Sequence, residues 1–131
     1  MLLFFKMEKL SITLVQTSLV WENTTANISH FDKIVSSIDK TDVVVLPEMF
    51  TTGFTMQPAK NAEPFDGKGL RWMKQKAAEK NCVIAGSICV EENKNFYNRL
   101  YWAEANKLQQ YNKRHLFRMG TEDQHYTMGT D

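Results

Sequence analysis

An acidic residue follows an apolar run in the first half of the chain. Glu48 comes after Val43 to Leu46 and Pro47, and Met49 and Phe50 follow it. In open α/β sheets, ligands bind beyond the carboxyl ends of the strands. A carboxylate in these surroundings would be partly desolvated, and a desolvated carboxylate is a better general base near neutral pH. The alternative is an ordinary surface glutamate at a strand end that caps a loop amide.

Two further charged residues that could do chemistry lie near the end of the sequence. Lys113 lies in the stretch Tyr111 to Phe117, where its ammonium group could stabilise a developing oxyanion or hold a carboxylate. The alternative is a solvated basic cluster on a sheet edge, where lysines are common. Glu122 lies in the polar segment Gly120 to His125, and taken alone it is an ordinary exposed acid.

The cysteine and histidine patterns indicate neither a nucleophile nor a metal site. Cys82 and Cys89 lie in or beside an apolar stretch, and their odd spacing places them on opposite faces of a strand. We expect both to be buried in the core, without a polar cluster around them. Ser87 lacks the glycine pattern of a nucleophile elbow. Because His115 and His125 have no partners at metal-ligand spacing, we expect no metal and no cofactor.

The elements that must position these residues begin with a strand, a helix and a second strand. Leu10 to Gln16 alternates with period two, which is typical of a strand. Asn23 suits the N-cap of a helix that runs to about Ile38 with one apolar face. Val43 to Leu46 is wholly apolar, as in a strand buried on both faces. Together they predict a βαβ unit with a right-handed crossover.

The second part of the chain predicts a helix and a further set of strands. A helical stretch follows Gly67 and Gly69, and Asn81 can end it in the left-handed conformation. Three strands then follow, and the last residues from Arg114 onward are polar with little periodicity. The predicted strands are Val83 to Val90, Phe96 to Glu104 and Lys107 to Lys113. The fold class is α/β, with at least five strands, two helices on one sheet face, and a sheet that becomes antiparallel towards its end.

Composition excludes several classes of protein. The chain has 131 residues and a formal net charge of +1, so its balanced charge argues against a nucleic-acid partner. No apolar run has the length of a membrane span, and Met1 to Phe5 is too short for a signal-peptide core. Since two cysteines give no disulfide framework, we expect a cytoplasmic protein.

Two stretches together resemble the signatures of the carbon–nitrogen hydrolase (nitrilase) superfamily. They are Val44 to Phe54 and Tyr111 to Phe117, and Gln16, Trp21 and the triplet Tyr97-Asn98-Arg99 also fit. The segments PEMFTTGFTM and KRHLF are most similar to those of the omega-amidase branch, whose members hydrolyse the terminal amide of 2-oxoglutaramate and 2-oxosuccinamate. The resemblance implies an incomplete α-β-β-α sandwich, in which residues 1–131 form the N-terminal portion of a single domain.

The resemblance also implies roles for three residues. Glu48 would be the general base that deprotonates a cysteine, Lys113 would stabilise the oxyanion, and Glu122 would orient the lysine and the leaving amine. The family's nucleophilic cysteine lies on a further strand beyond the second motif, so the chain should be inactive alone. The substrate would be a small amide, and the full-length protein would form a homodimer. Glu48 and Lys113 should then lie within about 3–6 Å of each other.

Two other readings remain open. The chain could be an inactive truncated remnant that binds a partner through an exposed sheet edge or helix face. It could also be an unrelated small α/β ligand-binding domain, in which Glu48 and Lys113 form a salt bridge.

Overall fold

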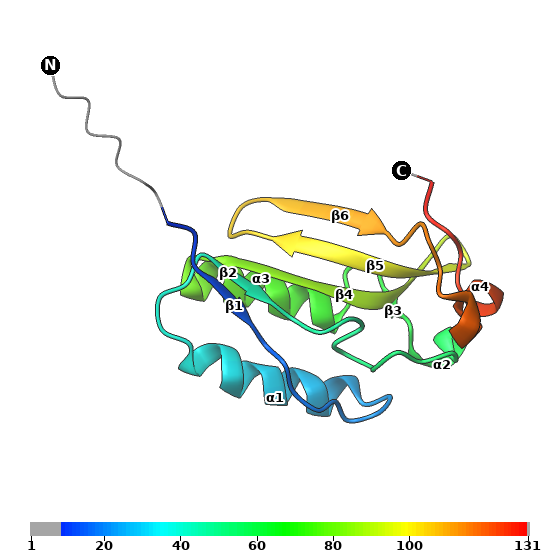
Figure 1. The fold of residues 1–131 in the computed structure, drawn as a ribbon, viewed down its shortest axis with the longest axis horizontal. Coiled ribbons are helices and arrows are strands. Elements are labelled where there is room, and N and C mark those ends of the chain that lie inside the picture. Colours follow the sequence, from blue (N-terminus) through cyan, green and yellow to red (C-terminus); the bar gives the residue numbers. More distant parts are fainter. Residues whose placement is uncertain (1–8, 131) are drawn as a thin grey trace, which may run out of the picture.

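A six-stranded mixed sheet, with helices against one face, organises residues 9–130, the part described by this computed structural model (Figure 1). The strands lie side by side in the order β1-β2-β4-β5-β6, and β3 pairs with β4. The strands are β1 Ile12–Leu14, β2 Val43–Val45, β3 Glu63–Pro64, β4 Val83–Glu92, β5 Asn95–Ala103 and β6 Leu108–Asn112. The helices are α1 Thr24–Ser37, α2 Pro58–Asn61, α3 Lys68–Lys80 and α4 Glu122–His125, and η1 Arg118–Gly120 is a 3₁₀ turn.

The first part of the sheet is parallel, as the βαβ pattern predicts. β1 pairs with β2, and β2 pairs with β4, both in parallel register. The predicted cap of α1 is confirmed, because the Asn23 side chain accepts a hydrogen bond from the Ala26 backbone. Asn81 ends α3 with φ 49° and ψ 49°, the left-handed conformation predicted for it. Both crossover helices are therefore delimited by local sequence signals.

The second part of the sheet is antiparallel, which is also confirmed. β4, β5 and β6 pair as two consecutive hairpins. Asn93 and Lys94 form the first turn, and both have positive φ, as tight two-residue hairpin loops require. The second turn lies around Ala105 and Asn106. The second hairpin places the middle of β5 beside the end of β6, where Arg99 pairs with Asn112.

The core lies between the sheet and the two long helices. α1 contributes Phe31 and Val35, α3 contributes Leu70 and Met73, and all four are buried. Their rings and aliphatic chains pack against the face of the sheet that carries Ile84 and its neighbours at period two. The prediction that two helices cover one sheet face is therefore confirmed.

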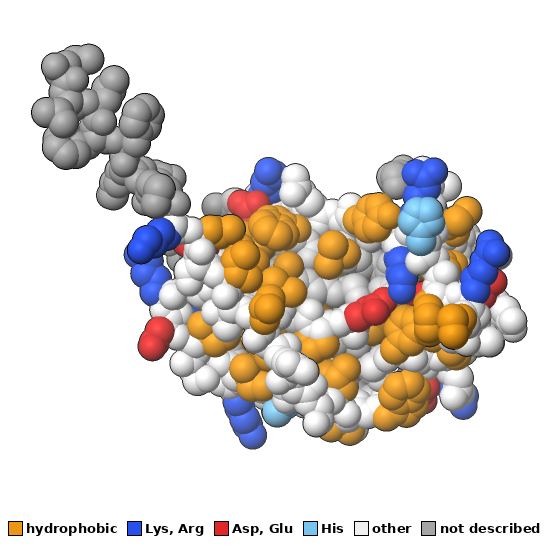
Figure 2. All heavy atoms as spheres, in the orientation of Figure 1, with side chains coloured by type: hydrophobic (Ala, Val, Ile, Leu, Met, Phe, Trp, Pro, Cys, Tyr) orange, Lys and Arg blue, Asp and Glu red, His pale blue; other side chains and the backbone are white. Residues whose placement is uncertain are grey.

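The opposite face of the sheet is largely uncovered. Residues paired in register point to the same side, so Ile12, Leu14, Leu100 and Tyr111 all lie on this face. Their exposed fractions range from 42% for Tyr111 to 74% for Leu14. Figure 2 shows hydrophobic side chains gathered on the visible surface. We call this the open sheet face.

The structure corrects several local expectations. β1 has only three residues, instead of running from Leu10 to Gln16, and its two apolar residues, Ile12 and Leu14, are exposed on the open sheet face. No sequence pattern predicts α2 or β3, because both are too short to show periodicity. The tail after Arg114 contains η1 and α4, although it shows little periodicity. Met1 to Phe5 lies outside the described residues.

No helix in residues 9–130 is long and apolar enough to span a membrane.

Candidate active site

Glu48 lies in a sharp turn just beyond the carboxyl end of β2. The next residue, Met49, has φ 47°, which is left-handed backbone that a non-glycine residue rarely adopts. The turn is held by Ser87 of β4: its hydroxyl accepts the Met49 N–H at 2.8 Å, and its carbonyl accepts the Phe50 N–H at 3.2 Å. The Glu48 side chain is half exposed. The neighbouring strand therefore fixes the backbone that carries this carboxylate.

Lys113 lies directly after β6 and reaches across to Glu48. Its Nζ is 2.9 Å from Oε1 of Glu48 and 2.9 Å from Oε2 of Glu122. The ammonium group also lies 5.1 Å from the centre of the Phe54 ring. Partial burial would lower the pKa of Lys113, but hydrogen bonds and charge attraction from Glu48 and Glu122 outweigh it and raise that pKa. The predicted approach of Glu48 and Lys113 is therefore confirmed.

Glu122 is the first residue of α4, and its side chain is completely buried. Its Oε2 accepts the backbone N–H of Phe117 at 2.7 Å in addition to the ion pair with Lys113. The reading of Glu122 as an ordinary exposed acid is wrong. The tail folds back over the end of the sheet, where Tyr126 donates its hydroxyl proton to the carbonyl of Thr55 at 2.7 Å. Only this return of the chain buries the carboxylate.

Asn98 joins the two carboxylates, a role that sequence reasoning missed. It lies on β5, is 2% exposed, and donates from Nδ2 to Oε1 of Glu48 at 2.7 Å and to Oε1 of Glu122 at 3.0 Å. The backbone carbonyl of Asn98 also accepts the backbone N–H of Lys113 at 2.9 Å. The available signal was its place opposite Lys113 in the predicted hairpin, within a triplet that fits the family resemblance.

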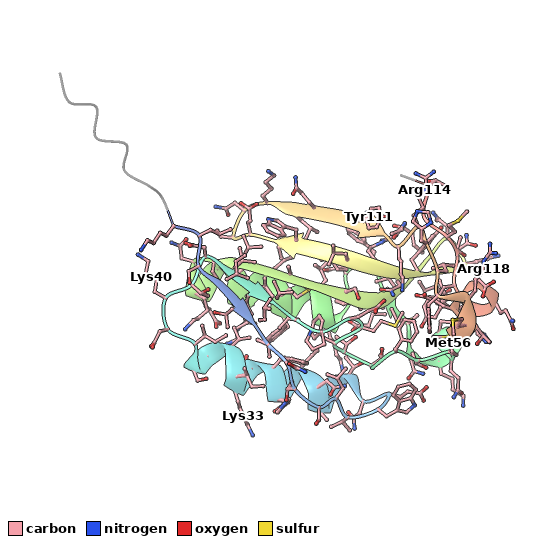
Figure 3. All side chains as sticks on the ribbon, viewed as in Figure 1. Lys33, Lys40, Met56, Tyr111, Arg114 and Arg118 are labelled. Carbon is pink, nitrogen blue, oxygen red and sulfur yellow. The ribbon has the colours of Figure 1, made fainter. Side chains whose placement is uncertain are left out.

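A shallow hollow of about 180 Å³ lies over these groups. Glu48, Lys113, Asn98 and Ser87 line it together with two apolar side chains of the open sheet face, Leu100 and Tyr111. A second hollow of about 210 Å³ adjoins it and shares Leu100 and Tyr111. In Figure 3, Tyr111 is labelled on β6 and Arg114 beyond the end of that strand, with Lys113 between them in sequence. The charged cluster is thus accessible from the open sheet face.

Both cysteines are buried, as predicted. Burial raises the pKa of the Cys89 thiol to about 11, and burial also raises the pKa of Cys82. Cys89 is not free of polar neighbours, because the Tyr126 hydroxyl lies 3.4 Å from its sulfur, brought there by the folded tail. A protonated, enclosed thiol is a poor nucleophile. Neither cysteine of this chain therefore has the surroundings of an activated thiolate.

The arrangement combines a half-exposed carboxylate, a lysine and a buried carboxylate. A carboxylate can accept a proton from a nucleophile, and a fixed ammonium group can stabilise the negative oxygen of a tetrahedral intermediate. These are two of the three components that thiol-dependent acyl transfer requires, the third being the thiol.

Curated amidases are among the proteins to which this chain is similar. The chain is 43% identical to omega-amidase YafV of Escherichia coli (strain K12) over 124 residues, which are 94% of this chain and 48% of that protein. It is 30% identical to 2-oxoglutaramate amidase of Bacillus subtilis (strain 168) over 128 residues, 94% of this chain and 49% of that protein. The chain therefore spans about half the length of the curated relatives it matches.

Solved structures share the fold. A carbon–nitrogen hydrolase superfamily protein from Xanthomonas campestris, whose structure carries an arsenic adduct in the active site, matches with a TM-score of 0.91 at 36% identity. That match covers 95% of this chain and 48% of the other. The α/β fold class, present here as an incomplete part of the family architecture, is confirmed. The family model for carbon–nitrogen hydrolases matches residues 11–130, and the chain therefore belongs to the carbon–nitrogen hydrolase family.

Proposed function

We propose that this chain is the N-terminal portion of a single omega-amidase domain and supplies Glu48, Lys113 and Glu122 to its active site. The observation that carries the proposal is the position of Lys113, whose Nζ lies 2.9 Å from an oxygen of each carboxylate beside an open hollow. The names of the relatives, omega-amidase and 2-oxoglutaramate amidase, support a small 2-oxo acid with a terminal amide as substrate.

In the proposed reaction, Glu48 accepts the proton of a cysteine thiol and the thiolate attacks the amide carbon. Lys113 stabilises the negative oxygen of the tetrahedral intermediate. Glu122 holds Lys113 in place. The proton taken by Glu48 passes to the leaving nitrogen, ammonia departs, and water then hydrolyses the thioester with Glu48 again as base.

The nucleophilic cysteine would come from a segment outside this chain. Cys82 and Cys89 are both enclosed, and burial raises the pKa of each thiol. The open sheet face, with Leu14 at 74% exposure, is where a second sheet would pack and bring the cysteine beside Glu48. The complete protein would then be a cytoplasmic homodimer with no cofactor.

A second candidate is a non-catalytic interaction module. The observation that favours it is the same open sheet face, since an exposed apolar surface of this kind marks an interaction site. It predicts that the chain binds a partner but contributes nothing to amide hydrolysis.

The test joins this chain to the half of the E. coli relative that it does not match, in one polypeptide. The folded fusion should release ammonia from 2-oxoglutaramate, and the 131-residue chain alone should not, because general-base assistance alone gives only ~10²–10⁴-fold. Activity should disappear with Glu48→Gln. The matched control is Glu91→Gln, an exposed residue of β4 outside the site, which should leave activity unchanged. A folded fusion without activity, or one indifferent to Glu48→Gln, would contradict the proposal and favour the interaction module.

A further inference from the structure

The two carboxylates of the site differ in how their oxygens are occupied. Glu122 is fully buried, and both its oxygens are bound: Oε1 by Asn98, and Oε2 by Lys113 and the Phe117 N–H. Glu48 is half exposed, and both of its donors, Asn98 and Lys113, bind the same oxygen, Oε1. Within residues 9–130, Oε2 of Glu48 receives no hydrogen bond. One carboxylate is saturated, and the other keeps a free oxygen.

The Asn98 amide accounts for this difference. Carboxylates only accept hydrogen bonds, so the amide must turn its NH₂ group towards them, and each of its two N–H bonds serves one carboxylate. The amide carries no charge, so it joins Glu48 and Glu122 without adding repulsion or a competing cation. Asn98 is itself held in place, since it is 2% exposed and its backbone carbonyl accepts the backbone N–H of Lys113.

We propose that Asn98 is a positioning residue of the site, which binds Oε1 of Glu48 and thereby leaves Oε2 as the oxygen that takes the proton of the nucleophile. It also holds Glu122 beside Lys113, so that Glu122 anchors the lysine and takes no proton itself. The mechanistic part of this inference rests on the proposed function. The geometric part, that Asn98 keeps both carboxylates at Lys113, does not depend on catalysis.

Titration of Lys113 reports on this geometry, because Glu48 and Glu122 together raise its pKa. Three other titratable groups lie nearby. Tyr111 lines the same hollow as Lys113, Cys89 is paired with Asn98 across β4 and β5, and Tyr126 belongs to the folded tail. They are common to all variants, so a difference between variants comes from the substitution. The two carboxylates that contact Lys113, those of Glu48 and Glu122, are present in the unaltered chain and in both variants below.

The experiment follows the ¹³Cε shift of Lys113 against pH in the 131-residue chain and in two variants. Asn98→Ala releases both carboxylates, so the Lys113 pKa should move down. Asn98→Leu keeps most of the side-chain shape but removes both N–H donors, so the Lys113 pKa should also move down. The matched control, Asn95→Leu, makes the same change at an exposed position of β5 and should leave the pKa unchanged.

Downward shifts in both variants support the inference. A role for Asn98 in packing alone would lower the Lys113 pKa in Asn98→Ala but leave it unchanged in Asn98→Leu, which would overturn the inference, as would no shift in either folded variant. Amide spectra show whether each variant is folded, and if Asn98→Ala is not, the shift of Asn98→Leu decides alone.

A second readout separates this inference from the proposed function. In the active fusion, Asn98→Ala should lower kcat ~10–100-fold with little change in KM, because a misplaced base impairs chemistry more than binding. Downward pKa shifts in both variants with an inactive fusion would retain Asn98 as the residue that holds the carboxylates and reject the amidase. An active fusion whose kcat is unaffected by Asn98→Ala would reject the role of Asn98 alone.

Discussion

Lys113 Nζ lies 2.9 Å from Oε1 of Glu48, although 65 residues separate the two in sequence. The contact joins the residue after β6 to the turn after β2, and these strands are not neighbours in the sheet. Lys113 crosses the ends of the strands between them to reach Glu48. The pair therefore links the parallel and antiparallel parts of the sheet.

Loss of the lysine should weaken the fold. Lys113→Met keeps most of the side-chain length but leaves the buried Glu122 carboxylate without its cation. We expect the free energy of unfolding to fall by about 1–3 kcal/mol, measured by urea denaturation at pH 7. Lys107→Met, an exposed lysine between β5 and β6, should change it by less than about 0.5 kcal/mol. Equal effects from the two substitutions would show that the Lys113 contacts contribute nothing to stability.

Stability should also depend on this lysine at high pH. The folded-state pKa of Lys113 is raised above its ordinary value of 10.5, so its stabilising contribution is complete below that value and is lost as the pH rises through the folded-state pKa. Urea midpoints at pH 9 and pH 11 should therefore fall less for Lys113→Met than for the unaltered chain. Other lysines and tyrosines titrate in both proteins, and the comparison removes them. Parallel falls would contradict the assigned shift.

Cys89 should resist thiol reagents in the folded chain. Its side chain is fully buried and its pKa is raised to about 11. At pH 8, a chromogenic disulfide should react with Cys89 only as fast as the chain opens, and at full speed in urea. A Cys82→Ser variant isolates the Cys89 signal. Rapid labelling of that variant in the native state would mean that Cys89 is an accessible thiolate. Cys89 would then be a candidate nucleophile.

The aromatic cluster beneath the sheet should dominate stability. Phe31 is fully buried and meets Phe50 edge to face, with ring centres 5.4 Å apart. Phe31→Ala should lower the free energy of unfolding by about 3–5 kcal/mol in urea titrations. Phe65, at 45% exposure, is the matched control and should cost under about 1 kcal/mol when changed to alanine. A small loss at Phe31 would mean that α1 does not pack on the sheet.

Much of the framework could be predicted from local sequence. The strand predicted at Val43 to Leu46, the left-handed Asn81 and the hairpin around Ala105 and Asn106 are all encoded by neighbouring residues, and each prediction is confirmed. The proximity of Glu48 and Lys113 came from a family resemblance, since no local pattern relates the turn after β2 to the end of β6. Their contact is now observed, but their catalytic roles stay predictions.

What could not be predicted depends on the return of the tail. In the sequence, Glu122 resembles an exposed acid. It is buried because α4 folds over the end of the sheet, and a four-residue helix shows no periodicity that would predict this. Asn98 entered only through a matching triplet with no role assigned, because an amide reveals its function only by what it touches. The exposure of Ile12 and Leu14 on β1 could not be predicted either, since alternation marks two faces without saying which one is covered.

The backbone and the side chain of Met49 favour different residues at this position. Glycine would relieve the strain of the left-handed backbone, because it adopts this conformation without steric cost. Its side chain, however, is fully buried beside Cys89 and Tyr126, and glycine would leave a void there. A substitution that eases the turn therefore empties the packing, and one that preserves the packing keeps the turn under tension. The residue next to Glu48 has few acceptable replacements, so sequence drift at this position should be narrow even though it touches no reacting group.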